Sequence, residues 1–515
     1  MSLHARIATL LVLAMLLVSP AAAQFDDVLD ADREQQLARD LAELGKVRER
    51  VRTLQRESIE AFTEGDLDTA AEKLEAVLEL RPGNALAMYN LACVRAMQGQ
   101  EDAALEHLIA AIERGFVNYN HLSRDPSLSS IRETDTYRRI IESWPEIIEA
   151  RGAAQVEDAK RRYGRRYLYE IDEDLRLGVA AAYDQTTLDT IKEELRLIAD
   201  WATAEVFPEL RERASPVPDP WVLMVLPNER HFKRWAIVAY GPDAILNQFH
   251  RVGGAYNHDQ RELVSMDLGG TLRHEFMHVL HWRSNERAGV THPIWVQEGL
   301  CSLVEDYVVE NGRLVPTPSW RTNQLKRLEE AAGLMPIERL ATLPRHRFVG
   351  ERPLAHYAHA RAIFLFLSQE GKLGAWYQHY QEHFASDPSG VESLEAVFGE
   401  EIEGVDRRFI TWLRALPVVG EARTDGSTRH LTASLGLELD PGTGEGPIVL
   451  SVRQRDLRRV IRRRDVLYSI DGRPVRDMND LTRTLGDLFP GQTVDVGLRR
   501  GREHLTVPVR LVEPR

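Results

Sequence analysis

Apolar residues recur at helical spacing through the first part of the chain, from Asp26 to about Ile141. Two segments in this region align with a period of 34 residues, which pairs Gly65 with Gly99, Ala70 with Ala104, and Leu74 with Leu108. Small residues where helices cross, and glycine at the turn between them, let paired helices pack closely. The pattern therefore predicts helical hairpins over residues 24–150.

Beyond Gly152 short apolar runs replace the helical spacing. Strands are expected at Tyr167–Ile171, Leu175–Ala182 and Trp221–Leu226, with one or two more between Gly253 and Met266. Helices are expected from about Thr186 to Val206 and again from Arg321 to Leu416. A small sheet followed by a mainly helical lobe predicts an α+β domain over residues 160–417.

The end of the chain has a third pattern. A stretch of mixed charge with two glycines, residues 418–430, is interpreted as a linker. Residues 431–513 then form a β-rich unit, with strand-like runs at Gly446–Leu450, Asp465–Ile470, Thr493–Leu498 and Leu505–Leu511 and a short helix from Met478 to Leu485. Asp471-Gly472 predicts a tight turn between strands. The chain is therefore predicted to be α+β and multidomain.

The first residues have the order of an export signal. His4 and Arg6 precede an apolar run from Ile7 to Val18, and small residues follow up to Ala23. The run is short for a membrane span, so cleavage before Gln24 is favoured over an uncleaved anchor. The sequence predicts a signal peptide over residues 1–23, a periplasmic or secreted protein, and no stable membrane span after cleavage.

The charge and the cysteine content of the chain exclude some kinds of partner and structure. The formal net charge of −14 over 515 residues argues against a nucleic-acid binder, which normally carries a basic face. The two cysteines, Cys93 and Cys301, lie in different predicted domains and are interpreted as small core residues, with no disulfide predicted.

The segment from His274 to His278 carries the strongest chemical signal, His-Glu-Phe-Met-His. On a helix the two histidines leave the same face one turn apart and can bind one ion. Glu275 lies beside the first histidine, where it can reach a metal-bound water instead of the metal. Glu298, in Trp-Val-Gln-Glu-Gly on the next expected helix, is the candidate third ligand. Two imidazoles and one carboxylate favour a single Zn²⁺ ion with one position open for water.

This arrangement resembles the gluzincin clan of metallopeptidases, and in particular its peptidase-MA-like branch. The resemblance covers roughly Tyr167 to Leu416 and implies a zincin-like catalytic domain that hydrolyses peptide bonds, with Glu275 as general base. In gluzincins a carboxylate one turn after the glutamate ligand often orients a histidine. That position here is Ser302, so Glu305 is the expected substitute and Asp306 the alternative.

The same resemblance implies a hydrogen-bond donor for the oxyanion. Tyr357 stands near the start of a helix where related enzymes carry a catalytic tyrosine, with His356 and His359 as alternatives. Related aminopeptidases hold the free amine of the substrate with a glutamate at the end of a glycine-rich strand. The corresponding stretch, Gly253–Asn257, has no acid there, which favours an endopeptidase.

The flanking regions also resemble known modules. The 34-residue period resembles the tetratricopeptide repeat, which implies either a groove for a protein partner or a helical spacer. Leu431 to Val512 resembles a PDZ domain, with Leu435, Gly436 and Leu437 matching the loop that captures a peptide's C-terminal carboxylate. Arg464, in the exposed basic run from Arg458, replaces the glycine usual before Asp465, so a domain that only packs on its neighbour is the alternative.

Taken together, the sequence predicts an exported zinc metallopeptidase that acts on a protein or peptide substrate, with a PDZ module for peptide capture or gating. The alternative is a non-catalytic, peptidase-like adaptor that binds protein partners through its helical repeats and PDZ module. Degenerate enzymes tend to lose the base or a ligand. This chain retains His274, Glu275, His278 and Glu298, which favours activity. A weaker third interpretation is a zinc hydrolase that acts on a substrate other than a peptide.

Overall fold

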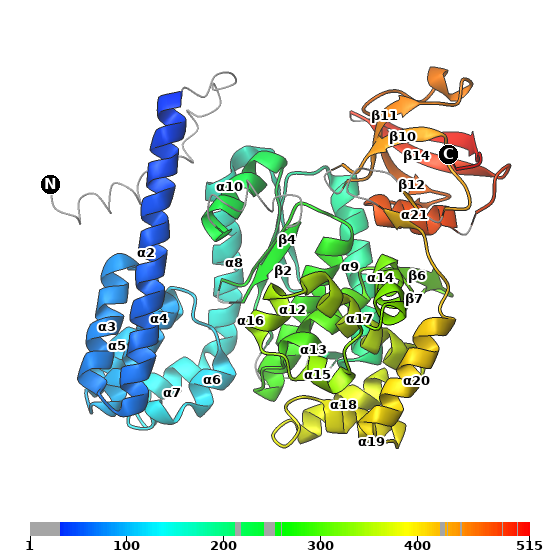
Figure 1. The fold of residues 1–515 in the computed structure, drawn as a ribbon. Coiled ribbons are helices and arrows are strands. Elements are labelled where there is room, and N and C mark those ends of the chain that lie inside the picture. Colours follow the sequence, from blue (N-terminus) through cyan, green and yellow to red (C-terminus); the bar gives the residue numbers. More distant parts are fainter. Residues whose placement is uncertain are drawn as a thin grey trace. The chain divides into compact units, whose positions relative to one another are not determined.

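The computed structural model describes residues 31–211, 218–240, 253–258, 260–422, 428–429, 431–442, 445–486, 488–501 and 503–514. The predicted signal peptide lies outside these residues. The chain is α+β and multidomain, as predicted, with helical hairpins first and a β-rich domain last (Figure 1). Its contacts define two compact units, of which the first holds the described parts of 1–184, 214–252 and 257–263, and the second those of 185–213, 253–256 and 264–515.

The first unit begins with the predicted helical hairpins. The small and apolar repeat positions Ala70, Leu74, Ala104 and Leu108 are all buried at helix contacts. Gly65 and Gly99 have φ angles of 82° and 74° at the turns, a conformation that favours glycine. The helices are α2 (Ala31–Glu64), α3 (Leu67–Leu80), α4 (Ala85–Met97), α5 (Glu101–Glu113), α6 (Tyr119–Arg124), α7 (Asp135–Glu142) and α8 (Trp144–Tyr163).

The change of pattern after Gly152 does not end a helix, because Gly152 lies inside α8. A Cβ atom at Gly152 would lie 2.5 Å from the indole ring of Trp221. The glycine therefore permits a close approach between α8 and this ring. The domain limits predicted from the sequence stay a prediction.

A five-stranded sheet has the order β1-β2-β3-β5-β4. Strands β1 (Leu168–Asp172) and β2 (Leu177–Ala181) are antiparallel, and β2 runs parallel to β3 (Val222–Leu226). Every residue of β2 and β3 is buried, which explains their continuous apolar runs. The edge strand is β4 (Gly254–Asn257), beside β5 (Glu262–Ser265), so the strands expected from the sequence are confirmed. Two helices follow β2 and β3 in the chain, α9 (Gln185–Glu205) and α10 (Glu229–Tyr240).

The helical lobe of the second unit starts with α12 (Gly270–Ala288) and α13 (Ile294–Leu303). A hairpin that the sequence reading missed, β6 (Tyr307–Glu310) and β7 (Arg313–Pro316), follows α13. Its turn, Asn311-Gly312, has positive φ at both residues, as a tight hairpin requires. The remaining helices are α14 (Trp320–Glu330), α15 (Ile337–Ala341), α16 (Arg345–Gly350), α17 (Pro353–Gln369), α18 (Leu373–His383), α19 (Val391–Phe398) and α20 (Ile402–Ala415).

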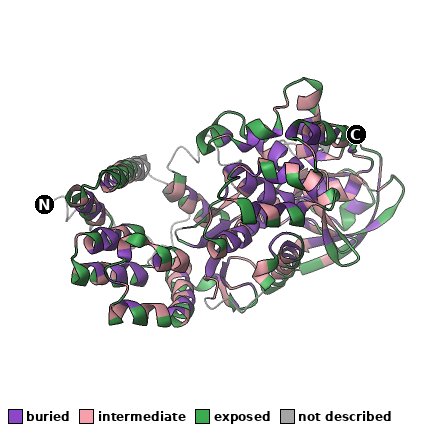
Figure 2. Ribbon diagram, turned by 90° about the horizontal axis from the view of Figure 1, so that it is seen from below, coloured by how far each residue is buried: buried purple, intermediate pink, exposed green. Residues whose placement is uncertain are grey.

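Helix α13 packs against both α12 and α17, and almost all of its residues are buried. Figure 2 shows how many of the protein's helical residues are buried. Trp295 is fully buried and stacks on Phe364 of α17, with 5.2 Å between ring centroids. At Gly299 a Cβ atom would lie 2.5 Å from the same Phe364 ring. The contacts of Trp295 and Gly299 with Phe364 fix the position and rotation of α13. They therefore also fix the direction of Glu298, which lies between Trp295 and Gly299 in the sequence.

The C-terminal domain is built on a second sheet, of order β10-β11-β12-β14-β15, with β13 paired to β12. Asp471 and Gly472 have φ angles of 49° and 75°, so the predicted tight turn is present. Within the stretch interpreted as a linker, two short strands pair as β8 (Glu421–Ala422) and β9 (Thr428–Arg429). The other elements are β10 (Leu437–Asp440), β11 (Ile448–Val452), β12 (Val466–Ile470), β13 (Arg473–Pro474), α21 (Met478–Gly486), β14 (Thr493–Arg500) and β15 (Glu503–Arg510).

Candidate metal centre

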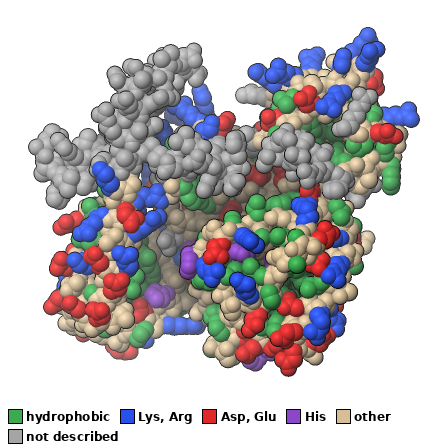
Figure 3. All heavy atoms as spheres, viewed as in Figure 1, with side chains coloured by type: hydrophobic (Ala, Val, Ile, Leu, Met, Phe, Trp, Pro, Cys, Tyr) green, Lys and Arg blue, Asp and Glu red, His purple; other side chains and the backbone are tan. Residues whose placement is uncertain are grey.

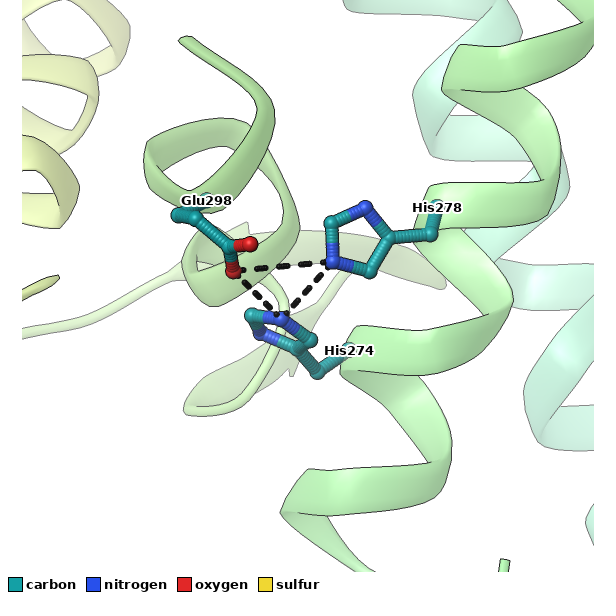
Figure 4. Close-up of side chains that lie close together, drawn as sticks. All are labelled: His274, His278 and Glu298. Atoms are coloured by element: carbon teal, nitrogen blue, oxygen red, sulfur yellow. Dashed lines mark hydrogen bonds and ion pairs between the residues drawn. The ribbon is translucent and has the colours of Figure 1, made fainter. Parts of the chain in front are cut away.

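The two histidines of the metal motif project from the same face of α12, as their spacing predicts. Their Nε2 atoms lie 3.1 Å apart, and the rings are nearly perpendicular at 76°. Glu298 reaches them from α13, with its Oε2 atom 3.2 Å from Nε2 of His274 and 3.6 Å from Nε2 of His278 (Figure 4). The structure thus brings the three predicted ligands together.

These separations fit a tetrahedral ion. Zinc bonds of about 2.05 Å to nitrogen and oxygen place tetrahedral ligand atoms roughly 3.3 Å apart. The three observed separations, 3.1, 3.2 and 3.6 Å, bracket that value. The triad is largely buried and could hold a metal ion.

The electrostatics of the triad also favour a cation. Burial opposes charge on His274, but hydrogen bonds to Glu298 and Glu305 raise its pKa to about 10. Burial would raise the pKa of Glu298, but the two histidines lower it well below its usual range. The carboxylates of Glu298 and Glu305 therefore stabilise a positive charge at this position. A bound proton or a metal ion can supply that charge.

Glu305 lies behind His274. Its Oε1 atom accepts a hydrogen bond from Nδ1 of His274 at 3.0 Å, whereas the hydroxyl of Ser302 is 3.4 Å from the same nitrogen. A partner on the outer nitrogen fixes the tautomer that leaves Nε2 free for a metal. Asp306, the alternative, is buried but ion-paired 3.5 Å from Arg483 instead.

Arg321 is a residue of this site that the sequence reading missed. Its guanidinium donates to both oxygens of Glu305, from Nε at 2.7 Å and from Nη2 at 2.9 Å. Burial would raise the pKa of Glu305, but Arg321 and His274 hold it well below its usual range. The only local signal was the Ser319-x-x-Thr322 capping box that starts α14 and places Arg321 in its first turn.

Cys301 contacts the outer nitrogen of the second histidine. Its Sγ atom is fully buried and lies 3.1 Å from Nδ1 of His278. Burial and the nearby carboxylates raise the pKa of Cys301 far above its usual value, so the thiol stays neutral. Cys301 and Cys93 are both free and buried, as their interpretation as core residues requires.

Replacing Glu305 with glutamine is expected to weaken zinc binding by about 10- to 100-fold, the usual effect of removing an outer partner of a metal ligand. The change leaves His274 without its anionic partner and removes the carboxylate that pairs with the half-buried Arg321. Chelator competition measures the dissociation constant. Glu310→Gln, at the exposed end of β6, is the matched control. Unchanged affinity in the Glu305 variant would contradict the assigned role.

The candidate general base is next to His274 in the chain, and the candidate oxyanion donor is near enough to Glu298 to be affected by its charge. Glu275 is half-buried on α12, and its carboxylate makes no hydrogen bond to any described residue. Tyr357 lies in α17, half-buried against Phe348, and its hydroxyl also makes no hydrogen bond within the described part of the chain. Burial and the charges of Glu298 and Glu275 raise the pKa of Tyr357 above its usual range, so the phenol keeps its proton.

The two alternative donors face other partners. Nδ1 of His356 is 2.8 Å from the carbonyl oxygen of Phe348, in a fully buried contact. His359 stacks on Phe409, and burial lowers its pKa to about 3. Tyr357 therefore remains the candidate donor, and its role stays a prediction.

Residues 433–511 match the PDZ domain family. The C-terminal domain is a PDZ domain. In this PDZ domain, Gly436 of the predicted carboxylate loop has a φ angle of 67° and leads into the edge strand β10. Arg464 adopts a φ angle of 73°, where the family pattern has glycine. The run from Arg458 to Arg464 is largely exposed, and Figure 3 shows basic side chains gathered on this domain.

Residues 61–118 match the tetratricopeptide repeat family, in agreement with the 34-residue period. No curated protein matched the sequence of the chain. One solved structure that it resembles is an aminopeptidase N family protein from Idiomarina loihiensis, which is 13% identical, with 68% of this chain and 67% of that chain covered and a TM-score of 0.30. At that TM-score the two folds are not shown to be the same. No described helix is both long and apolar enough to cross a membrane.

Proposed function

We propose that this protein is a zinc metallopeptidase that hydrolyses peptide bonds at the site formed by His274, His278 and Glu298. The observation that carries the proposal is the convergence of their three donor atoms, 3.1 to 3.6 Å apart, in a largely buried position beside Glu275. Two imidazoles and one carboxylate are the ligand set of catalytic zinc sites in peptidases.

When bound, zinc supplies Lewis acidity that polarises the scissile carbonyl and makes water a better nucleophile near neutral pH. Glu275 accepts the proton of the attacking water and delivers it to the leaving amine. The phenol of Tyr357, which keeps its proton, donates a hydrogen bond to the developing oxyanion. Glu305 and Arg321 hold His274 in the orientation that this chemistry needs.

The position of β4 at the edge of the sheet favours a peptide as the substrate. Among the described strands β4 is the last of the sheet, and an extended peptide could pair with such an edge strand. The strand sequence, Gly-Ala-Tyr-Asn, carries no acidic side chain that would hold a free amino terminus. An endopeptidase is therefore favoured over an aminopeptidase.

The flanking modules support a protein substrate or partner. PDZ domains and tetratricopeptide repeats generally bind peptides and proteins. We propose that the PDZ domain captures or admits peptide chains for the metal site, and that the helical repeats bind a protein partner. Residues 1–23 support export to the periplasm or beyond.

Removal of the metal tests this function. Treatment with a strong zinc chelator is expected to abolish cleavage of casein and of a peptide mixture, and added zinc should restore it. Mass spectrometry of the products reports whether cleavage is internal or terminal. A mock-treated sample carried through the same dialysis is the control.

A wild-type protein that binds one zinc ion but cleaves no peptide would contradict the proposal. That result would favour the non-catalytic adaptor, in which the PDZ domain and the helical repeats bind partners beside an inactive core. Cleavage that persists in the metal-free protein would contradict the assigned site itself.

A further inference from the structure

Helix α21 of the PDZ domain is joined to the metal-binding helix α12 through buried charges. Oδ1 of Asp480 accepts a hydrogen bond from Nη2 of Arg273 at 3.0 Å. The same guanidinium donates from Nη1 to Oε1 of Glu194 on α9, also at 3.0 Å. Arg273, Glu194 and Asp480 are all buried, at 3, 8 and 4% exposure. Arg273 directly precedes His274 in the chain.

A second PDZ residue reaches the first turn of α12. Oδ2 of Asp477 accepts a hydrogen bond from the backbone nitrogen of Gly270, the first residue of α12, at 3.2 Å. The other oxygen of Asp477 accepts from the backbone nitrogens of Asn479 and Asp480, both at 2.8 Å. One carboxylate thus binds free amide groups at the amino ends of both helices.

The segment that carries Glu305 is held by the same helix. Arg483 of α21 donates to the carbonyl oxygen of Tyr307 and lies 3.5 Å from the carboxylate of Asp306. Glu305 immediately precedes these two residues and binds His274. Helix α21 therefore contacts the helix that carries the first histidine ligand and also the segment that orients it.

Breaking the contacts between α21 and α12 would be strongly unfavourable. A buried charge that loses its partner strongly destabilises a protein. A shift of α12 relative to α21 would separate Arg273 from Asp480 and Gly270 from Asp477. The position of α12, and therefore that of His274, is coupled to the PDZ domain.

We infer that Asp477 and Asp480 of the PDZ domain are positioning residues of the metal centre. The inference rests on the proposed metal site and extends it. Beyond any capture of peptides, the PDZ domain holds α12 where His274 and His278 meet Glu298. The domain then supports the metal site through α12, and is not only a separate module attached to the catalytic domain.

The test is the zinc affinity of the full chain with Asp480→Asn, which removes the charge and keeps the shape. We expect affinity to fall about tenfold, as for other outer partners of a metal site. The matched control is Asp465→Asn in the same domain. Asp465 is equally buried and binds Arg500 at 2.7 and 2.8 Å within the PDZ domain. Its affinity for zinc should be unchanged.

Hydrogen exchange of α12 in the metal-free chain gives a second readout that does not depend on zinc. Asp480→Asn is expected to speed exchange of the amides around Arg273, and Asp465→Asn is not. Equal affinities and equal exchange in the two variants, or equal losses in both, would overturn the inference. A wild type that binds no zinc would instead contradict the proposed function, while the exchange of α12 would still decide whether Asp480 positions it.

Discussion

Replacing Glu275 with glutamine is expected to leave zinc bound and to lower kcat/KM for peptide hydrolysis by about three orders of magnitude. Glutamine has the shape of glutamate but cannot accept a proton. Glu275 projects from the same helix as the two histidines, yet it is not one of the three groups whose donor atoms converge. The loss should therefore fall on proton transfer and not on the metal. Steady-state kinetics on a quenched peptide, with zinc content measured in parallel, gives both quantities.

The control for this variant is Glu382→Gln, an exposed glutamate on α18 of the same unit. It should keep wild-type kinetics and zinc content. If the Glu275 variant retained activity within about tenfold of the wild type, another group would be the base. If it lost zinc, Glu275 would be acting on the metal, which contradicts the assigned role.

The parts of the site that sequence could predict are those set by local periodicity. His274 and His278 share a helix face because they are four residues apart, and this holds for any α-helix. The convergence of Glu298 depends on how α13 packs. The signs of that packing were Trp295 and Gly299, because an aromatic anchor and a close approach on either side of Glu298 leave it little freedom.

The parts that could not be predicted depend on contacts between distant segments. Glu305 was preferred over Asp306 on helical spacing, but α13 ends at Leu303, and Glu305 reaches His274 from the turn that follows this helix. Arg321, which completes that contact, comes from another helix and has no spacing relation to the ligands. The hairpin itself could have been expected from Asn311-Gly312 between short apolar runs.

The fold was predicted well where burial gives a clear pattern. The buried strands β2 and β3, the repeat helices and the PDZ strands β11, β12, β14 and β15 follow from apolar runs or periods, whereas the short strands β10 and β13 were not predicted. The contact between α21 and α12 does not, because it is made by Asp477, Asp480 and Arg273. Charged residues usually lie on a solvated surface. The sequence does not show which of them are buried, because that depends on ion pairs between distant segments.

Replacing Glu298 with alanine is expected to have the largest effect on the metal. With a ligand removed, zinc affinity should fall by more than about 100-fold, beyond the effect of losing an outer partner. His274 and His278 would also lose the buried carboxylate that now lies 3.2 and 3.6 Å from their Nε2 atoms. The matched control is Glu421→Ala, since Glu421 is buried to the same degree, at 8% exposure against 7%, and binds Asn323 and Arg327 instead.

The most direct test of the metal centre is therefore the zinc content of these three proteins after dialysis at a buffered, low concentration of free zinc. We expect one zinc ion per chain in the wild type and in Glu421→Ala, and almost none in Glu298→Ala. If Glu298→Ala kept as much zinc as the wild type, the ion would be bound elsewhere. That result would contradict the metal centre assigned to His274, His278 and Glu298.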